Sequence, residues 1–137
     1  MKLFLNDPAS LALQDALTGL SLRQQVISNN LANLNTPGFK AARVSFEAEL
    51  RNALEEATDP LPLRTTHADH FGDAPVALDA VQPTVQTLND RSMRLDGNNV
   101  DLERELAELT ETVIRFQAST QLMTRKIALL RGVISGR

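Results

Sequence analysis

The sequence has no cysteine, no tryptophan and no tyrosine, and its only aromatic residue is phenylalanine, present five times. Without cysteine the chain forms no disulfide bond and has no thiol nucleophile. This fits a reducing compartment or an exported protein that avoids oxidative crosslinks. With so few aromatic side chains, any core has to be built from leucine, isoleucine, valine, alanine and methionine, a composition typical of packed helices.

An excess of positive charge is also missing, because the formal net charge is −3 and the pI is near 5.3. No basic patch is interleaved with aromatic residues, which argues against nucleic-acid binding. No apolar run approaches the length of a membrane-spanning helix, about 18 residues. The N-terminus MKLFLNDP lacks the apolar core of a secretory signal peptide. We therefore expect no membrane span, and any export has to proceed without a cleaved signal peptide.

Motifs that mark common enzymes are absent as well: the sequence has no glycine-rich phosphate loop, no G-x-S-x-G motif and no Cys-His pair. The only residues grouped like metal ligands are His67 and His70, and no third ligand accompanies them. We interpret both as solvated loop residues. A metalloenzyme built on them is the alternative, which predicts stoichiometric metal in the purified protein. We expect no enzyme, no catalytic residue, no metal site and no cofactor.

The sequence does contain two long stripes of apolar residues that alternate four and three positions apart, the spacing of a coiled-coil seam. The first predicts a helix over residues 8–34, capped by Asp7 and begun by Pro8. The second predicts a helix that follows the capping residue Asp101. The first stripe comprises Leu13, Leu17, Leu20, Gln24, Ile27, Leu31 and Leu34. The second comprises Leu102, Leu106, Leu109, Val113, Phe116, Thr120, Met123, Ile127, Leu130 and Ile134.

These stripes predict a mainly α-helical fold in which the long N- and C-terminal helices pair as an antiparallel, coiled-coil-like hairpin. Residues 1–59 should hold the first helix, a turn and a second short helix. Residues 60–99 should form an irregular or small β segment, and residues 100–137 the last helix, which makes one helical core with residues 8–35. The polar members Gln24 and Thr120 either set the register or lie at its edge. The expected contact sets Leu106, Leu109, Val113, Phe116, Met123, Ile127 and Leu130 against Leu13, Leu17, Leu20, Ile27 and Leu31.

Each long helix also carries a second apolar row, which a single partner helix cannot cover. We therefore expect more than one helical neighbour, and a chain that is a subunit of an assembly. The second rows are Leu22 and Val26 on the first helix, and Ile114, Leu122, Leu129 and Val133 on the last.

The segment between the two stripes is less regular. Ser45 is the expected cap of a short helix that begins at Phe46 and ends near Pro60. Prolines and glycines then interrupt residues 60–99 too often for a long helix. Within this segment, residues 76–78 and 83–88 are candidate strands.

Two polar turns flank the middle segment. The first helix runs into a cluster of asparagines, which favour helix ends because their side chains compete for backbone hydrogen bonds. Thr36-Pro37-Gly38-Phe39 then places proline and glycine where a type II turn prefers them, so the helix should end at residues 33–35. Asp96-Gly97-Asn98-Asn99 predicts a second turn just before the last helix. We expect the asparagines to cap carbonyls or to bond neighbouring subunits.

The first of these turns resembles the N-terminal signature of bacterial flagellar rod and hook proteins, N-N-x-A-N-x-N-T-P-G-[YF]. The segment from Asp96 to Glu105, with Arg115-Phe116-Gln117 and Lys126-Ile127, is similar to the C-terminal helix of proximal rod subunits in that family. The matching signature positions are Asn29, Asn30, Ala32, Asn33, Asn35, Thr36, Pro37, Gly38 and Phe39. Many members have tyrosine where Phe39 stands.

The resemblance implies a structural protein of the flagellar basal body, exported unfolded by the flagellar type III apparatus and polymerised with itself and with other rod proteins across the periplasm. It further implies contact with the basal adapter between rod and MS ring, and with the export gate, whose recognition element Phe46 and Leu50 fit by spacing. The other type of proximal rod subunit is the alternative within the family. A soluble helical-hairpin adaptor or secretion chaperone is the alternative outside it.

Overall fold

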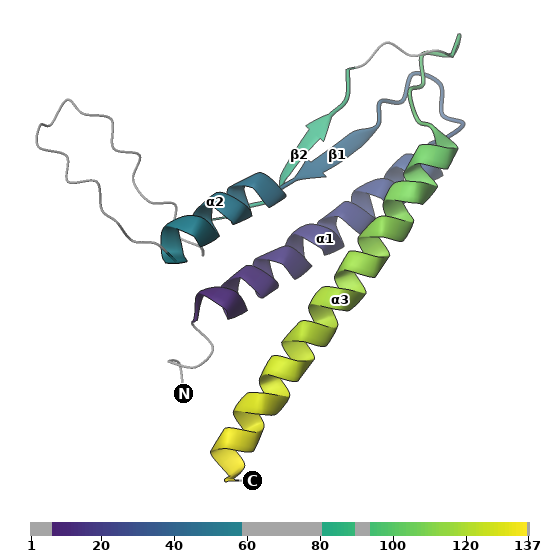
Figure 1. The fold of residues 1–137 in the computed structure, drawn as a ribbon. Helices are drawn as coiled ribbons and strands as arrows, with labels where there is room; N and C mark the ends of the chain where they lie inside the picture. The colour runs from purple at the N-terminus through teal and green to yellow at the C-terminus, as the bar shows by residue number, and fades with distance from the viewer. Residues whose placement is uncertain (1–6, 59–80, 90–93, 137) are drawn as a thin grey trace, which may run out of the picture.

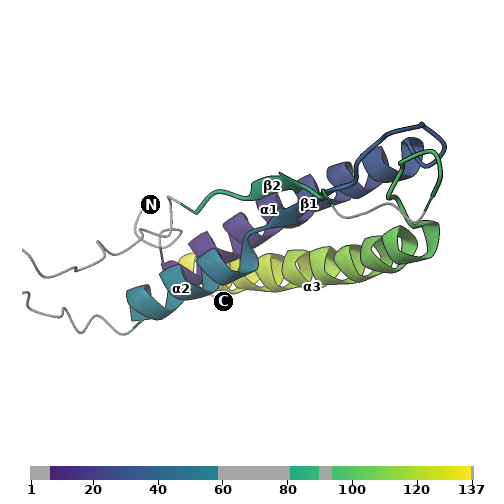
Figure 2. The same cartoon turned by 90° about the horizontal axis from the view of Figure 1, so that it is seen from above.

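The computed structural model describes residues 7–58, 81–89 and 94–136. The elements follow in the order α1 (Pro8–Ala32), β1 (Ala42–Ser45), α2 (Glu47–Thr58), β2 (Thr84–Thr87) and α3 (Leu102–Ser135). The two long helices α1 and α3 lie side by side and antiparallel, and α2 and the β1–β2 pair lie along another side of α1 (Figures 1 and 2). This arrangement confirms the predicted fold class, a mainly helical protein with a terminal hairpin and a small β element.

The ends of the long helices are fixed by local capping. The carboxylate of Asp7 accepts a hydrogen bond from the Ser10 N–H before α1, and Pro8 is the first helical residue. At the other end Asn33 is the C-cap of α1, in agreement with the predicted stop at residues 33–35. Asp101 caps α3 by accepting from the N–H groups of the two residues that follow Leu102. All three boundaries agree with the sequence-based prediction.

The middle of the chain departs more from expectation. β1 was not predicted, and it pairs antiparallel with β2, which lies inside the candidate strand of residues 83–88. The proposed cap at Ser45 is wrong, because Ser45 is the last residue of β1 and α2 begins only at Glu47.

The turn after α1 is as predicted: the Phe39 N–H donates to the Thr36 carbonyl at 3.2 Å, and Gly38 has a φ of +72°. The candidate strand of residues 76–78, and the two histidines, lie outside the described residues.

A small core joins α1 to β1 and α2. It is built around Leu20, Val44 and Phe46, against which Leu22 and Val26 pack. The chain itself therefore covers the second apolar row of α1, which we had assigned to a neighbouring subunit, because the unpredicted strand β1 lies on that row. A second cluster, formed by Ala53 and Val81 with Leu11, Ala12, Leu50 and Leu54, extends the core along α2.

The ring of Phe46 lies directly against the backbone of α1. A Cβ atom on Gly19 would meet three ring carbons at 2.7–2.8 Å, closer than real Cβ contacts. The guanidinium of Arg23 lies 5.0 Å from the ring centroid, a cation–π distance. Glycine at position 19 thus permits the close approach of Phe46 to α1.

Candidate functional site

The two polar turns meet at one end of the hairpin, where Asn98 is completely buried. Its Nδ2 donates to the carbonyls of Asn33, Leu34 and Thr36 at 2.9, 3.0 and 2.9 Å, and its Oδ1 accepts from the Val100 N–H at 2.7 Å. Carbonyls at a helix C-terminus have no intrahelical donor. A residue just before α3 therefore caps the end of α1.

Asn99 makes a second connection of the same kind. Its Oδ1 accepts from the Ala41 N–H at 2.7 Å, and its Nδ2 donates to the Leu88 carbonyl at 2.8 Å. This side chain thus ties the segments that lead into β1 and out of β2 to the start of α3. We call Asn30, Asn98 and Asn99 the asparagine latch.

The backbones of the two turns also fit each other. Gly38 and Gly97 both have positive φ, +72° and +77°, and a Cβ on Gly97 would lie only 3.8 Å from the Cα of Gly38. The Gly38 N–H donates to the Asp96 carbonyl at 2.8 Å, and Lys40 Nζ donates to the Gly97 carbonyl at 2.8 Å. The family-signature turn and the turn before α3 form one unit.

Asn30 is the third member of the latch and joins α1 to both β1 and α3. Its amide forms two hydrogen bonds with the backbone of Ala42, and its Nδ2 also donates to the carboxylate of Glu105 at 3.0 Å. Glu105 is 3% exposed. Burial raises the pKa of Glu105 because the charged form loses its water, although the hydrogen bond from Asn30 acts in the opposite direction.

This raised pKa predicts that Glu105→Gln is at least as stable as the unmodified chain at pH 7, because the amide still accepts from Asn30 without the cost of a buried charge. A folded pKa above the model value of 4.5 means that the contribution of Glu105 to stability is fully present below pH 4.5 and is lost as the pH rises through the folded pKa. The advantage of glutamine should therefore shrink as the pH falls toward 4.5. Denaturant midpoints of both proteins across this range measure it; a glutamine variant much less stable at pH 7 would contradict the assignment.

The structure buries the predicted stripe of α1 but only part of the predicted stripe of α3. All seven positions of the α1 stripe are buried or half-buried. On α3, the row with least exposure also alternates four and three positions apart, but it shares only Leu109, Phe116, Met123 and Leu130 with the predicted stripe. The complete row is Glu105, Leu109, Thr112, Phe116, Ser119, Met123, Lys126 and Leu130.

Polar residues occupy this row because they have particular partners. Lys126 Nζ donates to both carboxylate oxygens of Asp7, at 2.7 and 2.6 Å, and this hydrogen bond lowers the pKa of Asp7. Thr112 Oγ1 donates to the Glu108 carbonyl at 2.7 Å, and Glu105 accepts from Asn30. A prediction based only on apolar residues therefore chooses the neighbouring row of α3, which is the predicted stripe, over the row that is least exposed in the structure.

The remaining members of the predicted α3 stripe form a surface that the chain itself leaves largely open. We call this surface the α3 flank. Leu106 and Ile127 are 47% and 51% exposed, and Ile134 is 68% exposed. The flank comprises Leu102, Leu106, Val113, Thr120, Ile127 and Ile134, of which Val113 alone is half-buried.

The second row of α3 also stays exposed, as predicted from the sequence: Ile114, Leu122, Leu129 and Val133 are 54–78% exposed. Beside it, an apolar groove of about 440 Å³, which we call the α2 groove, lies between α1, α2 and α3. Its apolar lining consists of Ala12, Ala16, Leu20, Phe46, Leu50, Leu54 and Ala118.

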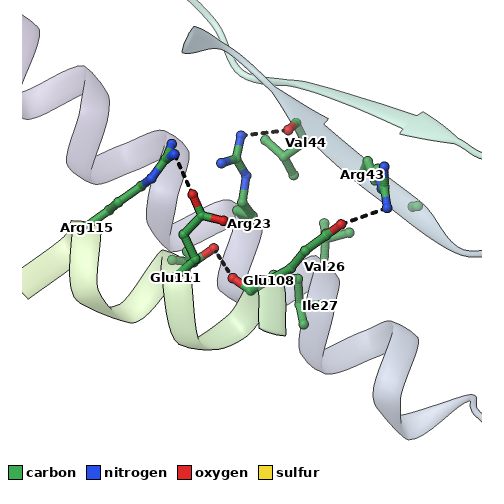
Figure 3. Close-up of a pocket in the computed structure, with 10 residues that line it drawn as sticks. Arg23, Val26, Ile27, Arg43, Val44, Glu108, Glu111 and Arg115 are labelled. Carbon is green, nitrogen blue, oxygen red and sulfur yellow. Dashed lines mark hydrogen bonds and ion pairs between the residues drawn. The ribbon is translucent and has the colours of Figure 1, made fainter. Parts of the chain in front are cut away.

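A charged groove of about 300 Å³ separates β1 from α3 (Figure 3). Its charges are paired within the chain: Arg43 with Glu108 at 2.7 Å, and Arg115 with Glu111. Arg23 donates to the Val44 carbonyl at 2.9 Å. The contacts of Arg43 and Arg23 fasten β1 to α3 and α1.

Glu47, at the start of α2, is held by two of these arginines, Arg23 and Arg115. Burial opposes ionisation of Glu47, but the hydrogen bond from Arg23 and those from the backbone prevail, so the pKa of Glu47 is lowered. Glu47 therefore stays charged and links α2 to both long helices.

The remaining residues named from the sequence are placed as follows. Phe46 is 3% exposed and Leu50 is partly buried, so the spacing that suggested an export element forms part of the core. In the family signature, Asn29 accepts from the side chain of Asn33, and Phe39 is half-buried. The exposed signature residues are Asn29, Ala32, Asn35, Thr36, Pro37 and Gly38.

Two kinds of site can be checked over the described residues. No helix there is both long and apolar enough to cross a membrane. Within the same ranges, no three histidine, cysteine, aspartate or glutamate side chains gather as metal ligands would. Sequence reasoning did not foresee the burial of Glu105 or Asn98, because their partners lie 62–75 residues away along the chain. The tight grouping of Asn98 and Asn99 beside Gly97 was the only local signal.

Comparison with known proteins defines the class of this hairpin. The family model described as Flagella basal body rod protein matches residues 11–40, which span most of α1 and the asparagine-rich turn. The flagellar basal body rod protein FlgB of Bacillus subtilis is 35% identical over 126 residues, which cover 90% of this chain and 91% of that protein. FlgB of Cereibacter sphaeroides is 35% identical over 128 residues, with 88% and 89% covered. FlgB of Escherichia coli K12 is 29% identical over 127 residues, with 88% of each covered.

The chain therefore belongs to the FlgB family of flagellar basal body rod proteins. This confirms the resemblance seen in the two turns and the last helix. Its function is that of a structural protein of the flagellar basal body rod. Of the asparagine latch, Asn30 lies within the residues that the family model matches, whereas Asn98 and Asn99 lie outside them.

Proposed function

We propose that this chain is a proximal rod subunit that the flagellar type III system exports and that polymerises through its terminal helices into the axial tube. The observation that supports polymerisation is the α3 flank, in which Leu102, Leu106, Ile127 and Ile134 are 45–68% exposed on a 34-residue helix. Several large apolar side chains left open on one face of a soluble chain mark an interaction site.

In this proposal residues 8–35 and 100–137 form the helical core that lies in the tube wall. Partners are further copies of the chain, other rod proteins, the basal adapter between rod and MS ring, and the export gate. The assembled protein occupies the periplasm, to which the flagellar type III system delivers it. Asn35 and Thr36, exposed beside the latch, are available to neighbouring subunits.

Leu106→Asp tests the role of the flank. Because Leu106 is 47% exposed in the chain, the new carboxylate remains hydrated in the monomer, but the assembled rod would bury it without a partner. We expect loss of rod incorporation and of motility, with helicity and melting temperature of the purified chain nearly unchanged. Circular dichroism and immunoblots of isolated basal bodies measure the two effects.

Ala107→Asp is the matched control, since Ala107 is exposed, lies next to Leu106 in the same turns of α3 and is outside the flank. It should assemble normally. Full motility of Leu106→Asp cells would remove the flank as a contact, and a discrete soluble dimer of the unmodified chain in place of a polymer would favour an adaptor.

A further inference from the structure

The α2 groove is a hollow with apolar walls and a charged rim. Its floor includes Leu20 and Phe46 of the core, its sides are Leu54 on α2 and Ala118 on α3, and Glu47, Arg51 and Arg115 line it as well. Its volume of about 440 Å³ suits a few apolar side chains of a helix, the arrangement in which an amphipathic helix is bound in a groove.

The same chain carries apolar side chains that extend outward from the hairpin. The contact of Lys126 with Asp7 marks where α1 begins. Beyond it α3 continues to Ser135, roughly 14 Å of helix at 1.5 Å per residue. Leu129 and Val133 on this stretch are 72% and 78% exposed, the highest values in the second row of α3. We call residues 127–135 the α3 end.

Charge distinguishes the two surfaces. From Thr112 to the C-terminus the sequence has no acidic residue, while Arg115, Arg125, Lys126, Arg131 and Arg137 are basic. Helix α2, one wall of the groove, carries four glutamates, at 47, 49, 55 and 56, against one arginine. Glu47 is paired with Arg23 and Arg115, and Glu55 with Arg51, so the acidic excess lies with the other two. Complementary charge of this kind favours encounter and fixes the register of an interface.

We propose that the α3 end of one copy docks in the α2 groove of the next copy. Leu129 and Val133 fill the apolar hollow, and Arg125 and Arg131 face the acidic residues of α2. Since the inserting and receiving surfaces are different parts of one chain, the contact is heterologous, and repetition of it gives an open array instead of a closed dimer. The inference deepens the proposed function, on which it rests, by naming the surfaces that join successive copies.

Because the natural sequence has no cysteine, engineered disulfides give a clean test. A Leu54→Cys/Val133→Cys double variant is produced in flagellated cells in place of the unmodified chain, and isolated basal bodies are oxidised. We expect disulfide-linked dimers and larger multimers, at several times the yield of a Leu54→Cys/Thr110→Cys control, since Thr110 is exposed on the N-terminal half of α3. A monomer with an internal disulfide, or equal yields from the two variants, would overturn the proposal.

Charge exchange gives an independent readout in the same double-cysteine background. Glu49→Lys and Arg131→Glu should each lower the multimer yield several-fold, and the combination of both should restore most of it. If neither Glu49→Lys nor Arg131→Glu lowers the multimer yield, the proposed charge complementarity between α2 and the α3 end is wrong. A double-cysteine chain that is present in rods but never links 54 to 133 overturns the docking alone, whereas the absence of the unmodified chain from rods overturns the proposed function itself.

Discussion

Replacing Asn98 with alanine is expected to lower the free energy of unfolding by about 3 kcal/mol and to prevent incorporation into rods. Asn98 itself has no solvent exposure, and the substitution removes the acceptor for the buried Val100 N–H and one donor to each of the carbonyls of Asn33, Leu34 and Thr36. Each carbonyl keeps a second donor, namely the Thr36 N–H, the Arg94 side chain and the Phe39 N–H, respectively. A buried N–H left without a partner costs about 1–3 kcal/mol and each further lost hydrogen bond about 1 kcal/mol, and relaxation with water entry offsets part of the sum. Urea unfolding followed by circular dichroism measures the change.

Asn98→Asp sharpens the test because aspartate has nearly the same shape. It keeps the acceptor for the Val100 N–H but places a carboxylate against three carbonyl oxygens, so it should be no better than alanine, and worse at pH 7 than at low pH. The control is Asn35→Ala, an exposed asparagine of the same cluster, which should change stability by less than about 0.5 kcal/mol. A near-neutral Asn98→Ala would show that the latch does not hold the ends of the hairpin together.

The second large effect is expected for Phe46→Ala, which should cost about 3–5 kcal/mol, the usual range for a buried phenylalanine. Phe46 is 3% exposed, packs with Leu20 and Val44, and rests against Gly19 of α1. Its removal leaves a cavity between α1 and β1. The thermal or urea midpoint of the purified variant reports the loss, and a variant as stable as the unmodified chain would contradict this core.

The same variant also bears on export, but only beside a control that damages the core equally. Leu20→Ala removes a buried side chain of the same cluster, at an expected cost of about 2–5 kcal/mol, and lies outside the Phe46-x-x-x-Leu50 spacing. If the export gate recognises Phe46 and Leu50 in the unfolded chain, Phe46→Ala should lower secretion and Leu20→Ala should not. Equal secretion of the two variants would assign Phe46 to the core alone.

Local chemistry was enough to predict both ends of α1, the turn after it and the start of α3. The capping and turn residues bond or bend the backbone within a few residues of their own position, so a single sequence reveals them. They are Asp7 with Pro8, Pro37 with Gly38, and Asp101. The long four-three stripes likewise revealed the terminal hairpin. These features concern one helix or one turn at a time.

The side of α3 that faces the hairpin could not be predicted in the same way. Several positions of the least exposed row of α3 hold polar residues, so a search for apolar residues at helical spacing does not find this row. Glu105, Thr112 and Lys126 are among these residues. Two of them are accepted there because Asn30 and Asp7, 75 and 119 residues away in sequence, supply their partners. Strand β1 was missed for a related reason, since its four residues gain their conformation from pairing with β2, far along the chain. Contacts between distant segments, not local propensity, decide both features.

The most direct test of the account is to isolate basal bodies from cells that carry either the unmodified chain or Leu106→Asp, and to measure the chain in the rod and in the secreted fraction. We expect unmodified chain in the rod, and a Leu106→Asp chain that is still exported but absent from the rod. Equal amounts of both chains in the rod, or unmodified chain found only as a discrete soluble oligomer, would contradict the claim that this hairpin assembles through the uncovered flank of its last helix.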